Sequence, residues 1–268
     1  MGNITNFLTS FVAKPRKEDD DSSVALRGDG YGNQYIKTLV GNKQALAEEA
    51  SYFTATVPIA TIDTGIAAAA VITAFTDTNS LALIQNTSSP GAGAVWIYPD
   101  FLRMYVEQGG TVTTTATCIR MVTRIWPSGI NPYVVGTPGT ILTPRAVNTS
   151  PGGAAGAVSA AKVIYLANGN AFTTLASTGQ GVRVIDNIQI PTGIMVLNDC
   201  YQLSFGCLDP MTQKHGQTAV RATDTAFLTI PTAPCAIGPG ETLQIMMWHP
   251  SGAGGPTAFE PTFGYWEH

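Results

Sequence analysis

Residues able to do acid–base or metal chemistry are few in this sequence, and their spacing forms no catalytic motif. The three histidines are His215, His249 and His268. None belongs to a His-Glu-x-x-His metal motif, a Gly-x-Ser-x-Gly nucleophile turn or a phosphate-binding glycine loop. We therefore expect no enzymatic activity, no catalytic, cofactor-binding or metal-binding residue, and no cofactor. A glycosidase stays open as an alternative, because a pair of carboxylates can meet only in three dimensions.

The carboxylates have the positions of tail and turn residues. Glu18 to Asp21 form a like-charged block beside a basic one, which is typical of a solvated tail and lacks the alternating spacing of a calcium loop. The isolated aspartates lie mainly beside expected strand ends and turns, where aspartate caps the backbone. They are Asp63, Asp77, Asp100, Asp186, Asp199 and Asp209.

Other short patterns have simple explanations in this composition. The cysteines lack Cys-x-x-Cys spacing and are expected to be small buried apolar residues. They are Cys118, Cys200, Cys207 and Cys235. Glycosylation sequons at Asn3, Asn86 and Asn148 are expected by chance in a chain rich in serine and threonine. Arg27-Gly28-Asp29 spells the integrin-ligand tripeptide, but its turn-forming surroundings explain the glycine and aspartate, so a use in adhesion stays open.

A basic and aromatic pattern lies in the stretch from Ile119 to Trp126. Side chains alternate along a strand, so Arg120, Arg124 and Trp126 are expected on one face. Two arginines are too few for a nucleic-acid groove, and the net charge of −4 with a pI near 5.3 argues against strong nucleic-acid binding. We interpret this face as a binding surface for a neighbouring subunit, where arginine and tryptophan are favoured.

The composition points to a protein whose surface is partly covered by other protein. Charged residues make up only 12% of the chain and hydrophobic residues 44%. Interface cores are depleted in charge, which suits a subunit packed against copies of itself. A secreted β-protein with threonine-rich strands is the alternative. The sequence shows neither a signal peptide nor an apolar run of membrane-spanning length.

The chain changes character near Tyr52, which predicts two regions. Residues 1–51 are expected to form an extended arm, with a small hairpin within Val24–Val40 and a short helix over Asn42–Ser51. Residues 52–268 predict one all-β domain with a long loop at 128–160; a boundary between two smaller β-domains is the alternative. The expected strands are Tyr52–Ile62, Ala69–Thr76, Ser80–Asn86, Ala94–Gln108, Thr111–Trp126, Ala161–Ala167, Gly181–Ile190, Cys200–Leu208, Thr225–Ile230 and Glu241–Trp248.

Two stretches of this region resemble jelly-roll virion proteins. "SLALIQNTSSPGAGAVWIYPDFLRMYVEQGGT" looks like an early strand, a glycine-rich turn and a long second strand, and "TAPCAIGPGETLQIMMW" looks like the final strand pair. With the charged arm and the charge-poor body, the chain is similar to the capsid proteins of small tailless icosahedral viruses, especially bacteriophages. The resemblance implies a single jelly-roll β-sandwich, with extra strands in the arm and the long loop.

The resemblance also implies a function. We expect a viral structural protein, the major capsid protein of a bacteriophage, made in the host cytoplasm and located in the virion. Its partners would be copies of itself, as trimers, pentamers or hexamers of an icosahedral lattice, and other virion proteins; contact with an internal membrane stays open. The alternative is a phage spike, fibre or decoration protein with a carbohydrate- or receptor-binding β-sandwich, using Tyr98, Tyr133 or Trp126 as a shallow aromatic site.

The last expected strand raises a question of its own. Leu243, Ile245 and Met247 alternate with Gln244, Met246 and Trp248, so both faces of the strand are largely apolar. One face can join the core of a sandwich. We expect the arm, a long loop or a neighbouring subunit to cover the other face.

Overall fold

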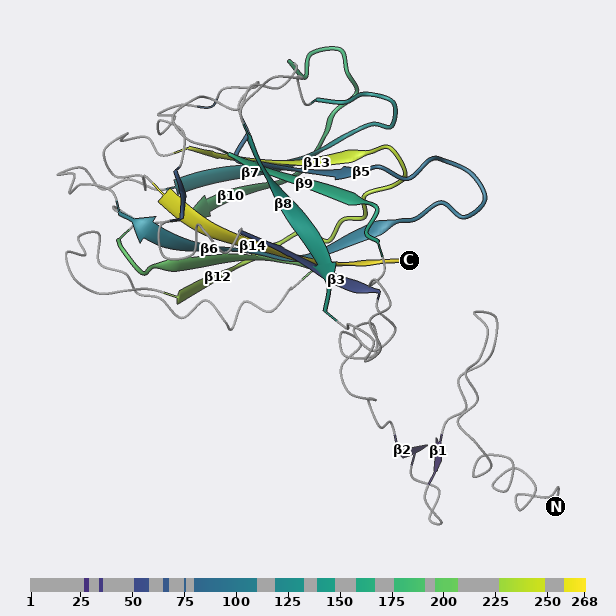
Figure 1. Ribbon diagram of the computed structural model, residues 1–268, viewed down its shortest axis with the longest axis horizontal. Helices are drawn as coiled ribbons and strands as arrows, with labels where there is room; N and C mark the ends of the chain where they lie inside the picture. Colours follow the sequence, from purple (N-terminus) through teal and green to yellow (C-terminus); the bar gives the residue numbers. More distant parts are fainter. Residues whose placement is uncertain are drawn as a thin grey trace. The chain divides into compact units, whose positions relative to one another are not determined.

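A computed structural model of the chain shows an all-β architecture (Figure 1). It describes residues 27–28, 34–35, 51–57, 65–67, 75, 80–109, 119–132, 139–147, 158–166, 176–190, 196–206, 227–248 and 258–268. Within these residues there are fourteen strands and no helix. The strands are β1 Arg27–Gly28, β2 Gln34–Tyr35, β3 Tyr52–Thr56, β4 Ile66–Ala67, β5 Ala82–Asn86, β6 Ile97–Gln108, β7 Ile119–Trp126, β8 Gly139–Ala146, β9 Ala161–Leu166, β10 Arg183–Ile190, β11 Cys200–Phe205, β12 Phe227–Thr232, β13 Thr242–Trp248 and β14 Ala258–Glu267.

The chain divides into two units, Met1–Ala45 and Leu46–His268. In the first unit, β1 and β2 pair in antiparallel register, which confirms the hairpin expected within Val24–Val40. The helix expected over Asn42–Ser51 lies outside the described residues except for Ser51, and so does most of the predicted arm.

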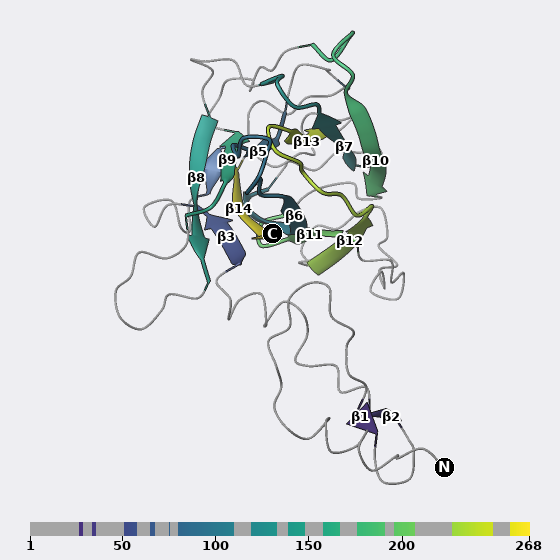
Figure 2. The ribbon, with the colours of Figure 1, turned by 90° about the vertical axis from the view of Figure 1, so that its right-hand side faces the viewer.

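The second unit is one continuous sheet that curls into two facing layers. Its strand order is β10-β7-β13-β5-β9-β8-β3-β14-β6-β11-β12, with β4 paired to β14 beside this path. Among the described ladders only β11 and β12 pair in parallel. Figures 1 and 2 show β10, β7, β13, β5 and β9 in one layer (the first layer) and β3, β14, β6, β11 and β12 in the other (the second layer). The sheet is therefore mostly antiparallel and nearly barrel-like, as Figure 2 shows from its end.

One strand joins the two layers. The first half of β8 pairs with β9, from Gly139 to Leu142, and its second half pairs with β3, from Thr143 to Ala146. This strand lies inside the stretch 128–160, which we predicted as a long loop with room for an extra strand. The threonines and proline of β8 gave no clear strand pattern in the sequence. In the structure, β8 is the strand at which the sheet passes from one layer to the other.

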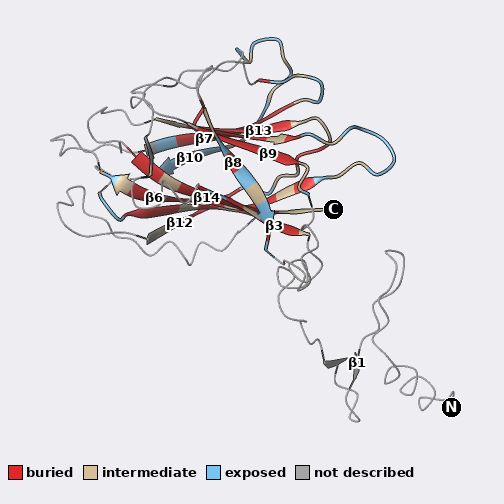
Figure 3. Ribbon diagram, viewed as in Figure 1, coloured by how far each residue is buried: buried red, intermediate tan, exposed pale blue. Residues whose placement is uncertain are grey.

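The core lies between the layers. The inward residues of β13 and β7, Leu243, Ile245, Met121 and Ile125, are at most 2% exposed and face the second layer. From that layer Phe263 and Tyr265 stack at 5.2 Å between ring centroids. Figure 3 shows buried residues along the facing strands of both layers. Burial of this apolar surface is the main contribution to stability of such a domain.

The two strands latest in the sequence are interior strands of the two layers. β13 lies between β5 and β7, and β14 lies between β3 and β6. The sequence predicts β13 but not β14, because Pro261 and Gly264 interrupt its pattern. Pro261 lies between the end of the β3 ladder at Thr262 and the start of the β4 ladder at Phe259, where a missing N–H group costs least.

The other strands expected from the sequence are confirmed where they fall within the described residues. The expected strand Ala69–Thr76 lies outside the described residues except for Phe75.

Gly264 lets two aromatic side chains lie across β14. A Cβ atom here would run into the ring of Phe101, the cross-strand neighbour on β6, and would lie 2.7 Å from Tyr52 Oη. We predict that Gly264→Ala lowers the free energy of unfolding by about 2 kcal/mol, because the added methyl overpacks this site. Urea denaturation measures the loss.

The matched control is Gly238→Ala, whose new Cβ would meet only the edge of the Trp96 ring at 3.1 Å and Glu241 Oε2 at 3.1 Å. Trp96 is 44% exposed and can move aside, so this loss should be smaller. Equal losses in the two variants would contradict the account of Gly264.

Candidate functional site

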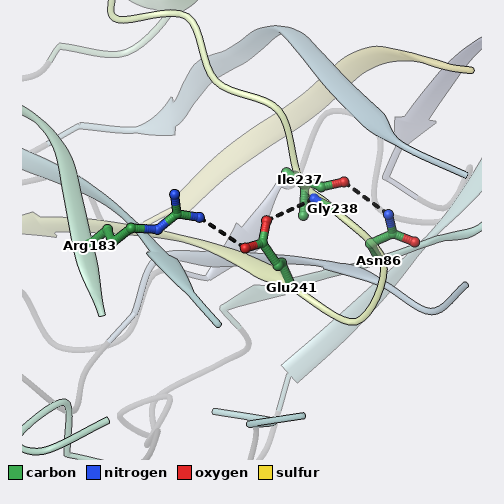
Figure 4. A network of polar contacts seen from close by, with 5 residues as sticks. All are labelled: Asn86, Arg183, Ile237, Gly238 and Glu241. Carbon is green, nitrogen blue, oxygen red and sulfur yellow. Dashed lines mark hydrogen bonds and ion pairs between the residues drawn. The ribbon is translucent and has the colours of Figure 1, made fainter. Parts of the chain in front are cut away.

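The turn before β13 fixes where that strand begins (Figure 4). Pro239 and Gly240 occupy its two central positions, Gly240 has a φ of 75°, and Glu241 N donates to Gly238 O at 3.0 Å. This is the pattern of a type II turn, which favours proline and then glycine. The Glu241 carboxylate accepts from Gly238 N at 2.8 Å and from Arg183 Nη2 at 2.9 Å. Asn86 Nδ2 donates to Ile237 O at 2.9 Å, so β5 holds the turn from the other side.

Around Gln244, the outward face of β13 and β7 is buried within the single chain. Arg124 lies directly opposite Gln244, and Gln244 Oε1 accepts three hydrogen bonds, from Arg124 Nε at 3.0 Å, Arg124 Nη2 at 2.7 Å and Trp126 Nε1 at 2.7 Å. Gln244 Nε2 donates to Ser80 Oγ at 2.5 Å, and Arg124 Nη1 donates to Ser177 Oγ at 3.2 Å. We call Arg124, Trp126 and Gln244 the Arg124 cluster.

The Arg124 cluster corrects one prediction. Arg124 and Trp126 do share a strand face, but they are 4% and 0% exposed, so they are no surface for a neighbouring subunit, and Trp126 is no shallow sugar site. Arg120 on the same strand is exposed. The second face of β13 is thus covered within the chain, with Ser80 and Ser177 among its contacts. The alternation of side chains along a strand predicts that Arg124 and Trp126 share a face, but it does not predict whether that face is buried.

The three aspartates among the described residues bind protein groups, but Asp100 and Asp186 lie within β6 and β10 and not beside strand ends as predicted. Asp100 Oδ2 accepts from Tyr52 Oη at 2.7 Å. Asp199 Oδ2 accepts from Val196 N and Tyr201 Oη at 2.9 and 3.0 Å, which confirms a turn role for Asp199. Asp186 Oδ2 accepts from Ala233 N at 2.9 Å and so ties edge strand β10 to the chain just after edge strand β12. Asp63, Asp77 and Asp209 lie outside the described residues.

The remaining sequence patterns give no built site in the part of the chain that is described. Asn86 is 1% exposed and donates to Val95 O and Ile237 O, so its sequon is not accessible. Cys200 is buried as expected, whereas Cys235 is only partly buried; desolvation there raises the pKa of the Cys235 thiol to about 12. No group of three or more histidine, cysteine, aspartate or glutamate side chains in the described residues could hold a metal. The structure does not describe Asn3, Asp29, Cys118, Tyr133, Asn148, Cys207, His215 or His249.

The outward face of the second layer differs, because it carries partly exposed aromatic side chains. We define the aromatic face as Trp96, Tyr98, Phe101, Arg103, Tyr105 and Trp266. A bulge opposite Gly264 and Tyr265 inserts Asp100 into β6, and this shift of phase puts both Tyr98 and Phe101 outward. Inward neighbours Leu102, Met104 and Val106 are at most 1% exposed, whereas Trp96 and Tyr105 are 44% and 36% exposed.

The side chains of the aromatic face hold one another in place. Tyr98 stacks on Trp266 across the β6–β14 pair, at 5.6 Å between centroids and an angle of 9°. The guanidinium carbon of Arg103 lies 5.4 Å from the Phe101 ring centroid and 5.6 Å from that of Tyr105. Such cation–π contacts fix the cation over the rings. Arg103 Nε is buried and has no hydrogen-bond partner among the described residues.

This arrangement suits binding. It offers flat apolar rings, a fixed cation and neighbouring polar side chains such as Gln202, Thr54 and Thr262, which aromatic-rich interfaces combine. Sequence reasoning singled out only Tyr98 of its members. The signal was present as alternation within "WIYPDFLRMYVE", but the phase change at Asp100 breaks a simple period of two.

We predict that Gln244→Leu lowers the free energy of unfolding by about 3 kcal/mol, since it removes the acceptor of three buried hydrogen bonds, two of them from a guanidinium. Chemical denaturation followed by tryptophan fluorescence measures this loss. The control is Gln85→Leu on the neighbouring strand, whose glutamine is only partly buried. A loss no larger than that of the control would contradict the role given to Gln244.

We also predict unfolding by base. Burial raises the pKa of Tyr52, Tyr165 and Tyr265, and at Tyr52 the hydrogen bond to Asp100 adds to the rise. A raised folded pKa means stability that is complete below the unfolded tyrosine pKa of about 10 and is lost as pH rises above it. Tyrosinate absorbance should therefore appear together with loss of β-sheet circular dichroism.

Tyr165→Phe provides the matched variant for this prediction. Tyr165 Oη is buried without a hydrogen-bond partner among the described residues, so the change removes an ionisable group at little cost. The midpoint of unfolding by base should move to higher pH. An unchanged midpoint would contradict the role of tyrosine ionisation.

Comparison with known proteins found no matching family model, no matching curated protein and no matching solved structure. In the described residues there is also no helix of the length and apolar character needed to cross a membrane. The candidate site of this chain is the aromatic face.

Proposed function

We propose that this chain is a structural subunit of a virus particle, the major capsid protein of a bacteriophage, which assembles with copies of itself into an icosahedral shell. The observation that carries the proposal is the aromatic face, a sheet surface with half-exposed rings and a single arginine on a chain of only 12% charged residues. Surfaces of this kind bury well against protein, because little charge must be desolvated.

The sheet topology supports a jelly-roll-like interpretation of the fold. β13 runs between β5 and β7 although these strands come far earlier in the sequence, and β10 extends the same layer beyond β7. A late strand that returns beside an early one is the hallmark of Greek-key sandwiches. In this proposal β8 and β9 are additions to the jelly roll that extend one layer and link it to the other.

Assembly would use different parts of the chain for different tasks. The facing layers supply the stable core, and the aromatic face supplies contact area on the outside. The arm of residues 1–51 would reach a neighbouring subunit and order there. Repetition in a symmetric shell makes many modest contacts strong together. The protein would be made in the host cytoplasm and reside in the virion, next to other virion proteins.

A carbohydrate-binding spike, fibre or decoration protein is the second candidate. It is favoured by one observation, the stacked pair of Tyr98 and Trp266 on a partly exposed sheet face. Sugar rings pack on such aromatic surfaces, and nearby Gln202 and Thr262 could bind hydroxyl groups. Of the residues that the sequence suggested for this role, Trp126 is buried, Tyr133 lies outside the described residues and Tyr98 alone lies on the partly exposed face.

Size measurement of the purified full chain separates the two functions. We predict large, closed particles by light scattering and negative-stain electron microscopy, across a range of salt and protein concentrations. A glycan array run on the same preparation serves as the comparison. A chain that stays a monomer or trimer under every condition and binds a glycan would contradict the capsid function and support the second candidate.

A further inference from the structure

The large sheet has two edge strands, and they meet on one side of the two layers. The strand order begins with β10 in the first layer and ends with β12 in the second layer. Figure 2 shows both strands on the same side of this unit. Among the described strands β10 and β12 share no ladder, so they lack the backbone hydrogen bonds that join neighbouring strands everywhere else along the sheet. We call the junction of β10 and β12 the seam.

A bulge in β10 directs the Asp186 side chain across the seam. The register of β10 with β7 shifts by one residue just before Asp186, which places Asp186 opposite Thr123. Thr123 in turn lies opposite the core residue Ile245, so Asp186 is on the inward face. Without the extra residue, the alternation of the strand would turn this carboxylate outward. Its Oδ2 accepts from Ala233 N, directly after β12, at 2.9 Å, and its Oδ1 accepts from Asn187 N at 2.8 Å.

The core is less completely covered at the seam than within the ladders. Of the four partly buried apolar residues that pack against the core in the described part of the chain, three lie here: Ile185 in the bulge, Leu228 on β12 and Cys235 just after β12. The hydroxyl groups of Thr123 and Thr232 are buried without a hydrogen-bond partner among the described residues. Opening of the seam would hydrate both hydroxyl groups, which offsets part of the cost of separating the two edges.

We infer that this unit opens and closes along the seam, and that Asp186 is the latch that holds it closed. Opening separates β10 from β12 while the ladders through the rest of the sheet stay intact, so it needs far less free energy than global unfolding. It exposes two strand edges, which pair readily with other strands. The latch therefore controls access to these edges. The inference does not rest on the proposed function, because opening is a property of the single chain.

Two thiols report opening and global unfolding separately. Cys235 lies at the seam, and burial raises its pKa to about 12, so at about pH 8 few closed molecules carry the reactive thiolate. Cys200 is 3% exposed on β11, between β6 and β12. The full chain is treated with iodoacetamide over a range of low urea concentrations, and peptide mass spectrometry assigns the label to each cysteine. Cys235 should react faster than Cys200 and with a weaker dependence on urea.

Variants of the latch test its role. Asp186→Ala removes the charge-assisted bond to Ala233 N, so the labelling rate of Cys235 should rise at least tenfold while that of Cys200 stays unchanged. Asp186→Asn keeps an acceptor oxygen and should raise the rate less. Glu267→Ala is the matched control, because the Glu267 carboxylate accepts from Ala160 N at 2.9 Å, a bond of the same kind away from the seam. This control should leave the labelling rate of Cys235 unchanged.

Three results would overturn the inference. They are equal rates and equal urea dependence at Cys235 and Cys200 in the unmodified chain, an unchanged Cys235 rate in Asp186→Ala, and a parallel rise at both cysteines. Circular dichroism checks that each variant is folded. If Asp186→Ala does not fold, Asp186→Asn decides, and a Cys235 rate equal to that of the unmodified chain then contradicts the latch.

Discussion

The placement of β13 and β14 inside the two layers, each between two other strands, is the constraint on which the rest of the structure depends. Each has a neighbouring strand on both sides, and these neighbours come from much earlier in the sequence. Without β13, β5 and β7 have no shared partner; without β14, β3 and β6 lose theirs. The turn at Gly238–Glu241 fixes where β13 begins. The missing side chain at Gly264 leaves room on β14 for Phe101 and Tyr52. Long-range pairing of this kind makes folding cooperative and slow.

The two layers then acquire different outer surfaces. Around β13 the outer face is closed within the chain, where Gln244 satisfies a buried arginine and a buried tryptophan. Around β6 and β14 the outer face stays partly exposed and aromatic, fixed by stacking and by one arginine between two rings. The strand β8 allows this difference, because it passes from one layer to the other and lets one sheet supply both surfaces. Edge strands β10 and β12 approach through the Asp186 side chain and not through a ladder.

Strand positions were largely predictable from the sequence, but their neighbours and covered faces were not. Short apolar runs rich in isoleucine, leucine and valine mark β5, β7, β9 and β10, because the residue pattern of a strand is a local property. Pro261 and Gly264 concealed β14. Pro261 is tolerated because it lies between the ends of the β3 and β4 ladders, and Gly264 is needed because Phe101 and Tyr52 lie across it. Arg124 was correctly predicted to share a strand face with Trp126. Its charge suggested that this face is exposed, but hydrogen bonds to residues distant in the sequence allow the arginine to be buried. The aromatic face was missed because the Asp100 bulge shifts the alternation of β6 in mid-strand, which only the register with β14 reveals.

Hydrogen exchange of backbone amides tests the central role of β13 and β14 most directly. Amides that exchange only through global unfolding report the strands on which the whole fold depends. The account predicts that the ladder amides of β13 and β14 are among the slowest in the described strands, and that they respond to denaturant with the slope of complete unfolding. Edge strands β10 and β12 should exchange faster through local opening. Exchange of β13 and β14 at or above the rate of these edge strands, with little dependence on denaturant, would contradict it.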